Sequence, residues 1–166
     1  ANVPDGQSIW ETSNSLWAAV QSGSNMIYHA AGWLEGGLIA SPEKFIMDCE
    51  IIQQIQRYMD PEIHSTDPDS IAISAIKEVG SAGHFFGVEH TQSRFESAFY
   101  QPFLSDWKNY EAWEAAGAEW TPKRAYKIYE QILHEFSEPT IDQGIDEELK
   151  DFVARRKTEG GAPTDF

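Results

Sequence analysis

The sequence predicts a mainly α-helical protein with one clear strand near its N-terminus. Apolar residues recur at helical spacing through most of the chain, and capping signals separate each such stretch from the next. The strand signal is confined to residues 25–30, which read NMIYHA. With 166 residues, 41% of them hydrophobic, the chain is long enough to bury a core.

Two helices flank the predicted strand. Apolar residues spaced three and four apart predict the first over residues 6–22. The second is predicted over residues 41–59, because Ser41 can cap it and Pro42 suits its first turn. The chain therefore opens with the order helix, strand, helix.

Helices follow one another after residue 60, each with its own cap or stop signal. Proline, serine and threonine mark their starts, and glycine marks several of their ends. We predict them over residues 67–80, 91–99, 105–117, 121–136 and 144–157.

Charge and composition restrict the classes of partner. The chain has 12 Lys and Arg against 27 Asp and Glu, a formal net charge of −15. Such a surface repels phosphate backbones and anionic headgroups, so we expect neither nucleic acid nor membrane as a partner. No apolar run is long enough to span a bilayer, and we expect a cytoplasmic protein.

Cys49 is the single cysteine, which excludes an intrachain disulfide and a thiolate metal cluster.

The stretch NMIYHAAGWLEGGL, residues 25–38, is unusual for protein core. An apolar strand ends in Tyr28 and His29, and Trp33 and Glu35 follow in a glycine-rich loop. A parallel-barrel strand presents its functional side chains in this way, at its C-terminal end. The alternative is that His29 is a hydrogen-bonded structural histidine and Trp33 a packing residue. Trp33 beside a carboxylate also suits a quaternary ammonium, which an aromatic face attracts without a hydrogen bond.

A second candidate stretch is GSAGHFFGVEH, residues 80–90, which carries His84 and His90. Their spacing lacks the helical offset of a two-histidine zinc motif and no cysteine pair accompanies them, so we predict no metal site. We expect this loop to lend polar side chains to a neighbouring substrate site.

Several longer motifs resemble the C-terminal region of the trimethylamine methyltransferase family, which includes pyrrolysine-free glycine betaine methyltransferases. They are SGSNMIYHAAGWLEGGLIASPEKFIMDCEII, AIKEVGSAGHFFGVEHT, YEAWEAAGA and ELKDFVARR, in the family's order. The resemblance implies the last third of a TIM-barrel enzyme. Residues 1–60 would end the barrel, residues 61–157 would form a helical C-terminal extension, and residues 158–166 a flexible tail.

The resemblance also implies an activity. Such enzymes move a methyl group from a methylamine or quaternary amine to the Co(I) of a corrinoid carried by a separate protein. We expect His29 and Glu35 to be catalytic, by orienting the substrate and balancing its charge. Tyr28 and Trp33 would form the cation cage, and His84 and His90 would contribute to substrate binding.

Two departures keep other functions open. No pyrrolysine is present, and its position in the family falls at or before the ANVPD with which the chain begins. Most barrel strands are absent too, so we expect the chain to be inactive unless the remainder of the barrel or a homo-oligomer completes it. The alternative is a non-catalytic helical module that binds a partner chain, or a quaternary amine without turnover.

Overall fold

The computed structural model describes residues 1–60 and 68–160 and confirms a mainly helical chain. Contacts divide it into two compact units, residues 1–132 and residues 133–166. No helix within the described ranges is long and apolar enough to cross a membrane.

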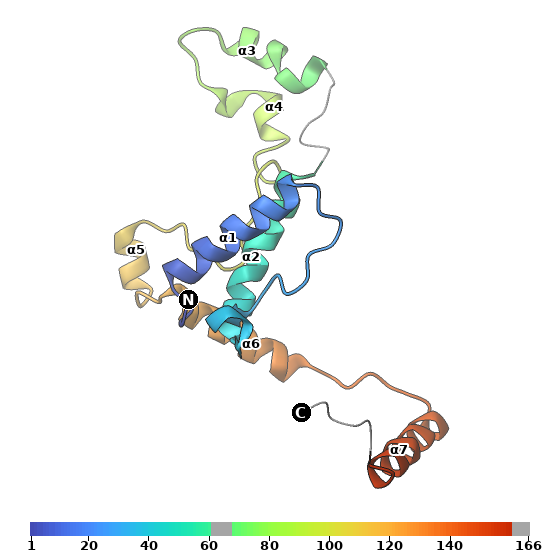
Figure 1. The fold of residues 1–166 in the computed structure, drawn as a ribbon. Coiled ribbons are helices and arrows are strands. Elements are labelled where there is room, and N and C mark those ends of the chain that lie inside the picture. The colour runs from blue at the N-terminus through green and yellow to red at the C-terminus, as the bar shows by residue number, and fades with distance from the viewer. Residues whose placement is uncertain (61–67, 161–166) are drawn as a thin grey trace. The chain divides into compact units, whose positions relative to one another are not determined.

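The first unit is built around α1 (Gly6–Gln21) and α2 (Pro42–Tyr58), which lie against each other (Figure 1). Both starts agree with the sequence. The Asp5 carboxylate caps α1 by accepting from the backbone N–H groups of Gln7 and Ser8. The Ser41 hydroxyl caps α2 by accepting from the N–H of Lys44, and Pro42 occupies the first turn.

Between these helices the structure corrects the strand prediction. Residues 25–30 form no strand, because no described segment pairs with them and an extended segment needs a neighbour for its backbone hydrogen bonds. The strands lie just beyond: β1 (Trp33–Leu34) pairs antiparallel with β2 (Ile39–Ala40). The 3₁₀ turn η1 (Glu35–Gly37) connects them.

The middle helices are shorter than predicted. The helix predicted from residue 67 is divided into η3 (Pro68–Ile71) and α3 (Ile73–Val79), because Ala72 adopts a left-handed φ of 55°. Its predicted start, residue 67, lies outside the described residues. After the turn η4 (Phe85–Gly87), α4 (Glu89–Gln92) ends well before residue 99.

The helix predicted from residue 105 begins later, as α5 (Tyr110–Ala115). The Asp106 carboxylate accepts from the backbone N–H of Lys108, a local bond that competes with helix formation. Asn109 then caps the helix. The prediction for the next helix is confirmed, since α6 spans Thr121–Glu135.

A small core holds α1, α2 and α6 together. Ile46, Met47, Leu104 and Ala125 are buried in it, and Ile9 packs against them. The residue 104–105 segment is fixed by a buried carboxylate of α2: Glu50 accepts from the N–H groups of Leu104, at 2.7 Å, and Ser105, at 3.2 Å, and from the Ser105 hydroxyl.

The second unit contains α7 (Gln143–Thr158), which matches the prediction of a last helix over residues 144–157. The Asp142 carboxylate caps it. The predicted boundary near residue 60 remains a prediction, because residues 61–67 lie outside the described part, and so do residues 161–166 of the predicted tail.

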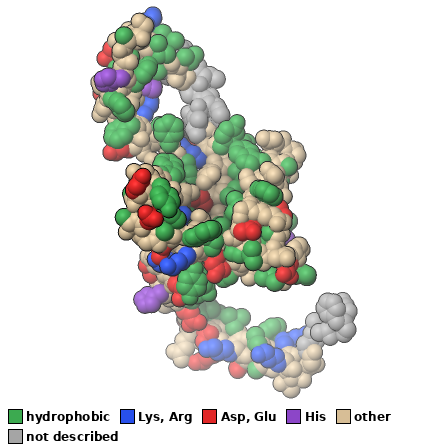
Figure 2. Space-filling model, turned by 90° about the vertical axis from the view of Figure 1, so that its left-hand side faces the viewer, with side chains coloured by type: hydrophobic (Ala, Val, Ile, Leu, Met, Phe, Trp, Pro, Cys, Tyr) green, Lys and Arg blue, Asp and Glu red, His purple; other side chains and the backbone are tan. Residues whose placement is uncertain are grey.

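Many large hydrophobic side chains are exposed, and Figure 2 shows them spread over the visible face. Met26, Tyr28 and Leu38, around the β1–β2 hairpin, are 70%, 77% and 84% exposed. This amount of exposed apolar surface is typical of an interaction surface.

A buried ion pair of the first unit joins Lys44 to Asp48, with Nζ 2.6 Å from Oδ2 and side chains 4% and 1% exposed. We predict that Lys44→Ala lowers the free energy of unfolding by about 3–5 kcal/mol, because it leaves the Asp48 carboxylate buried without its partner. Urea unfolding followed by circular dichroism measures this loss.

Lys123 provides the matched control. It pairs with Glu119 at 3.2 Å, also four residues away in the sequence, but its side chain is 65% exposed. Lys123→Ala should therefore cost no more than about 1 kcal/mol. Equal losses for the two variants would show that the Lys44 pair is as weak as a surface pair.

Cys49 offers a second test. Burial raises the pKa of its thiol, and the neighbouring Asp48 charge raises it further. Because only the thiolate reacts, alkylation of Cys49 by iodoacetamide should have its pH midpoint above the ordinary thiol value of about 8.5. The urea-unfolded chain is the control and should show the ordinary midpoint. A folded-state midpoint at or below that of the unfolded chain would contradict the assigned burial.

Candidate functional site

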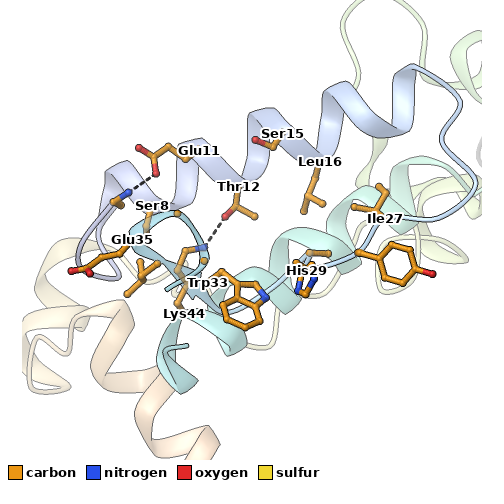
Figure 3. A pocket seen from close by; sticks show the side chains of 16 residues that line it. Ser8, Glu11, Thr12, Ser15, Leu16, Ile27, His29, Trp33, Glu35 and Lys44 are labelled. Carbon is orange, nitrogen blue, oxygen red and sulfur yellow. Dashed lines mark hydrogen bonds and ion pairs between the residues drawn. The ribbon is translucent and has the colours of Figure 1, made fainter. Parts of the chain in front are cut away.

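A pocket of about 600 Å³ lies between α1 and the residue 27–37 segment (Figure 3). It is lined by four residues predicted as site residues from the sequence: Tyr28, His29, Trp33 and Glu35. The structure thus brings these four side chains to one pocket even though the predicted strand is absent.

The loop that carries these residues is fixed at Gly32. Its backbone N–H donates to Asp48 Oδ2 at 2.8 Å, and its carbonyl accepts from the N–H of Ser41 at 2.8 Å. Gly32 has a φ of +84°, and a Cβ there would lie 3.1 Å from Cβ of Phe45. Only glycine permits both this backbone conformation and this close approach to α2.

His29 and Trp33 form the aromatic part of the lining. Their ring centroids are 5.3 Å apart and their planes meet at 75°, an edge-to-face pair. Figure 3 shows the two rings side by side in the pocket. His29 has a left-handed φ of 56°, which is uncommon for a residue with a side chain and turns the backbone just before Gly32.

Lys44 contributes a buried ammonium group to the lining. Nζ donates to Thr12 Oγ1 at 2.7 Å and to the two carboxylate oxygens of Asp48 at 2.8 and 2.6 Å. These bonds engage all three N–H donors of the ammonium group. Lys44 therefore serves the structure and leaves no donor for an anionic ligand.

Two carboxylates line the same pocket. Glu35 follows Trp33 in the loop, and Glu11 lies across from it on α1. Hydrogen bonds from the amine of Ala1 and from Gln7 lower the pKa of Glu11, so its carboxylate is ionised at neutral pH. Asp48 neutralises Lys44, and the Ala1 amine pairs with Glu11 at 2.8 Å, so the charge that these pairs leave over in the lining is the Glu35 carboxylate, which favours a cation.

The structure does not bring His84 and His90 to this pocket. The His84 side chain is exposed, with its ring centroid 6.0 Å from that of Phe86. His90 is half-buried at the start of α4, and neither histidine lines the pocket. Within residues 1–60 and 68–160, no group of three His, Cys, Asp or Glu side chains lies close enough to hold a metal ion.

Sequence reasoning missed the contribution of α1 to the pocket. Ser8, Glu11, Thr12 and Ser15 line it from one face of this helix. Their spacing of three, one and three places them on one face of a helix. This polar stripe beside the apolar one was the signal in the sequence that could have identified them. Nothing in the sequence showed that Lys44 would be buried.

Comparison with known proteins identifies the family. A family model described as trimethylamine methyltransferase matches residues 1–161. Over 157 residues the chain is 38% identical to a glycine betaine methyltransferase of Desulfitobacterium hafniense strain Y51. The matched region covers 95% of this chain and 32% of that protein. Over 161 residues it is 30% identical to a trimethylamine methyltransferase from strain DCB-2 of the same species, covering 97% of this chain and 32% of that protein.

A trimethylamine methyltransferase of Methanosarcina mazei is 28% identical over 154 residues, and the match covers 93% of this chain and 30% of that protein. The chain spans about a third of the length of these relatives. The four motifs noted in the sequence and the match over residues 1–161 lead to one conclusion: the chain belongs to the trimethylamine methyltransferase family.

Proposed function

We propose that this chain provides one wall of the methylated-amine site of a corrinoid-dependent methyltransferase. The observation that carries the proposal is the pocket that gathers Tyr28, His29, Trp33 and Glu35. Membership of a methyltransferase family supports it independently.

The chemistry of the pocket suits an N-methylated cation. A quaternary ammonium group has no N–H to donate, so aromatic faces and nearby carboxylates hold it electrostatically. Trp33 and Tyr28 supply the aromatic surface, and Glu35 supplies negative charge. His29, in contact with the Trp33 ring, orients the substrate against that surface.

The proposed reaction transfers one methyl group from the bound amine to a corrinoid carried by a separate protein. That corrinoid supplies the Co(I) nucleophile. The C–N bond breaks and its electron pair stays on nitrogen, so a quaternary amine leaves as a neutral tertiary amine without needing a proton. The residues of this pocket hold the nitrogen and aim one methyl group outward, and such positioning is their main contribution to the rate.

The other walls of the site are proposed to come from the remaining two thirds of the family's fold, a TIM barrel. Met26 and Leu38, which flank the pocket segment, are 70% and 84% exposed. A further part of the fold would cover this apolar surface. His84 and His90 lie outside the pocket lining, so their role in substrate binding stays a prediction.

Binding without turnover is the second candidate function. It is favoured by one observation: His29, Trp33 and Glu35, which would hold the cation, already meet in one pocket within this chain. Calorimetry with glycine betaine measures binding, and methylation of cob(I)alamin measures turnover. We expect the 166-residue chain to bind glycine betaine by itself. Methyl transfer should occur only when the rest of the family's fold is supplied.

Trp33→Ala tests the cation site. Loss of the indole face should weaken glycine betaine binding about fivefold, the equivalent of a cation–π contact of about 1 kcal/mol. Titration calorimetry on the folded chain measures the change. Trp107→Ala is the matched control, because Trp107 is 72% exposed and does not line the pocket. Equal affinities for the two variants would remove Trp33 from the site.

His29→Ala tests the catalytic assignment. The variant should bind the amine but transfer its methyl group more slowly once the barrel is complete, because the substrate is less well oriented. A stopped-flow assay of cob(I)alamin methylation under saturating amine separates this effect from affinity. Unchanged methyl transfer would remove His29 from the mechanism.

A further inference from the structure

The Thr12 hydroxyl is a hydrogen-bonding group of the pocket that keeps a proton to donate. Thr12 lies half-buried on α1 and lines the pocket, and its Oγ1 accepts from Lys44 Nζ at 2.7 Å. A threonine hydroxyl can donate one hydrogen bond as well as accept. In a helix it can donate to the carbonyl one turn back, as Thr158 does to Ala154 at 3.1 Å. Thr12 makes no such bond, and none of the described residues accepts its proton.

Lys44 makes this hydroxyl a stronger donor. Linked hydrogen bonds polarise one another, so an ammonium group that donates to the Thr12 oxygen raises the partial charge on its proton. Figure 3 shows the Thr12 side chain extending from α1 toward Lys44, with the His29 and Trp33 rings across the pocket. Because the oxygen faces the ammonium group, the O–H bond is directed away from Lys44, which leaves the proton for a ligand.

The charges behind Thr12 have the same effect. Lys44 and Asp48 form a neutral pair, but Lys44 lines the pocket and Asp48 does not. The pair therefore turns its positive end toward the wall that Thr12 belongs to. Glu11 precedes Thr12 on α1, and its carboxylate is paired with the Ala1 amine at 2.8 Å. This wall of the pocket therefore favours a negatively charged acceptor.

The pocket thus has two regions of opposite preference. Trp33 and Glu35 suit a quaternary ammonium group, as argued above. The polarised Thr12 hydroxyl suits a carboxylate, because hydrogen bonds to charged groups are the stronger ones. A small zwitterion that carries both groups would use both regions, whereas a simple alkylammonium ion would use only the first.

We propose that Thr12 is a specificity-determining residue of the methylated-amine site. Its hydroxyl donates to the carboxylate of a quaternary amine that bears one, so the pocket binds such a zwitterion more tightly than an alkylammonium ion. Lys44 acts through Thr12, since its own three donors are already engaged. This inference rests on the proposed function, because it takes Trp33 and Glu35 as the groups that hold the cation.

Two ligands and one substitution test the assignment. Glycine betaine and tetramethylammonium both carry a quaternary nitrogen, and only glycine betaine carries a carboxylate. Thr12→Val keeps the shape of the side chain and removes the hydroxyl. Titration calorimetry should show glycine betaine bound about tenfold more weakly by this variant, since a hydrogen bond to a charged group is lost. The affinity for tetramethylammonium should change less than about twofold, because that ion makes no contact that needs the hydroxyl.

Control variants separate recognition from structure. Thr12→Val also removes an acceptor from Lys44, and a purely structural effect would weaken both ligands alike. Thr12→Ser restores the hydroxyl and should bind both ligands as the unchanged chain does. Ser15→Ala is the matched control in the same pocket, because Ser15 lines it from α1 but takes no hydrogen bond from Lys44. Circular dichroism checks the fold of each variant.

The unchanged chain provides a measurement that needs no variant. The methyl ester of glycine betaine keeps the ammonium group and loses the negative charge. It should bind about tenfold more weakly than glycine betaine, because a neutral ester is a weaker acceptor for the Thr12 hydroxyl.

Three results would overturn the inference and leave the cation site in place. They are equal weakening of both ligands by Thr12→Val, a loss of glycine betaine affinity with Ser15→Ala as large as with Thr12→Val, and an ester bound as tightly as glycine betaine. Failure of the unchanged chain to bind either quaternary amine would contradict the proposed function, and this inference with it.

Discussion

The buried ion pair between Lys44 and Asp48 connects the three segments that form the pocket. Lys44 reaches α1 through the Thr12 hydroxyl, and Asp48 reaches the pocket loop through the N–H of Gly32. Both residues belong to α2, so one helix turn fixes the position of α1 and of the loop together. Because the pair is buried, removing either partner costs far more free energy of unfolding than forming the pair contributes.

The pocket follows from this arrangement. Because Gly32 is held against α2, the residues on either side of it, His29 and Trp33, face the same space next to α1. Lys44 and Asp48 neutralise each other beneath that space, the Ala1 amine pairs with Glu11, and the carboxylate of Glu35 remains at its edge. A small cation therefore fits the electrostatics of the pocket better than an anion does. The family identified by comparison, in which relatives are named for trimethylamine and glycine betaine, agrees with this preference.

Much of the fold was predictable, because helix starts are local features. Ser41 and Pro42 begin α2 where the sequence indicates, and α6 and α7 also match their predicted positions. The prediction of a strand over residues 25–30 was wrong, since an apolar run becomes a strand only beside a neighbouring segment, and the sequence does not show whether one is present. The break at Ala72 was likewise hidden, because a left-handed alanine has no sequence signal.

The site shows the same division between local and long-range information. His29, Trp33 and Glu35 stand out in the sequence because they follow an apolar run in a glycine-rich loop, and they meet in one pocket. Lys44 and Asp48 do not stand out, because a lysine and an aspartate one helical turn apart usually form an exposed surface pair. Only the packing of α1 and the loop on α2 buries them.

An NMR titration tests directly whether the loop fixed at Gly32 forms a cation site. Tetramethylammonium chloride is added to the ¹⁵N-labelled chain, with sodium chloride at equal ionic strength as the control. Saturable shifts are expected at the Trp33 indole N–H, at His29 and at backbone amides of residues 27–37. Shifts confined to other tryptophans, such as Trp107 and Trp120, or no difference from sodium chloride, would contradict it.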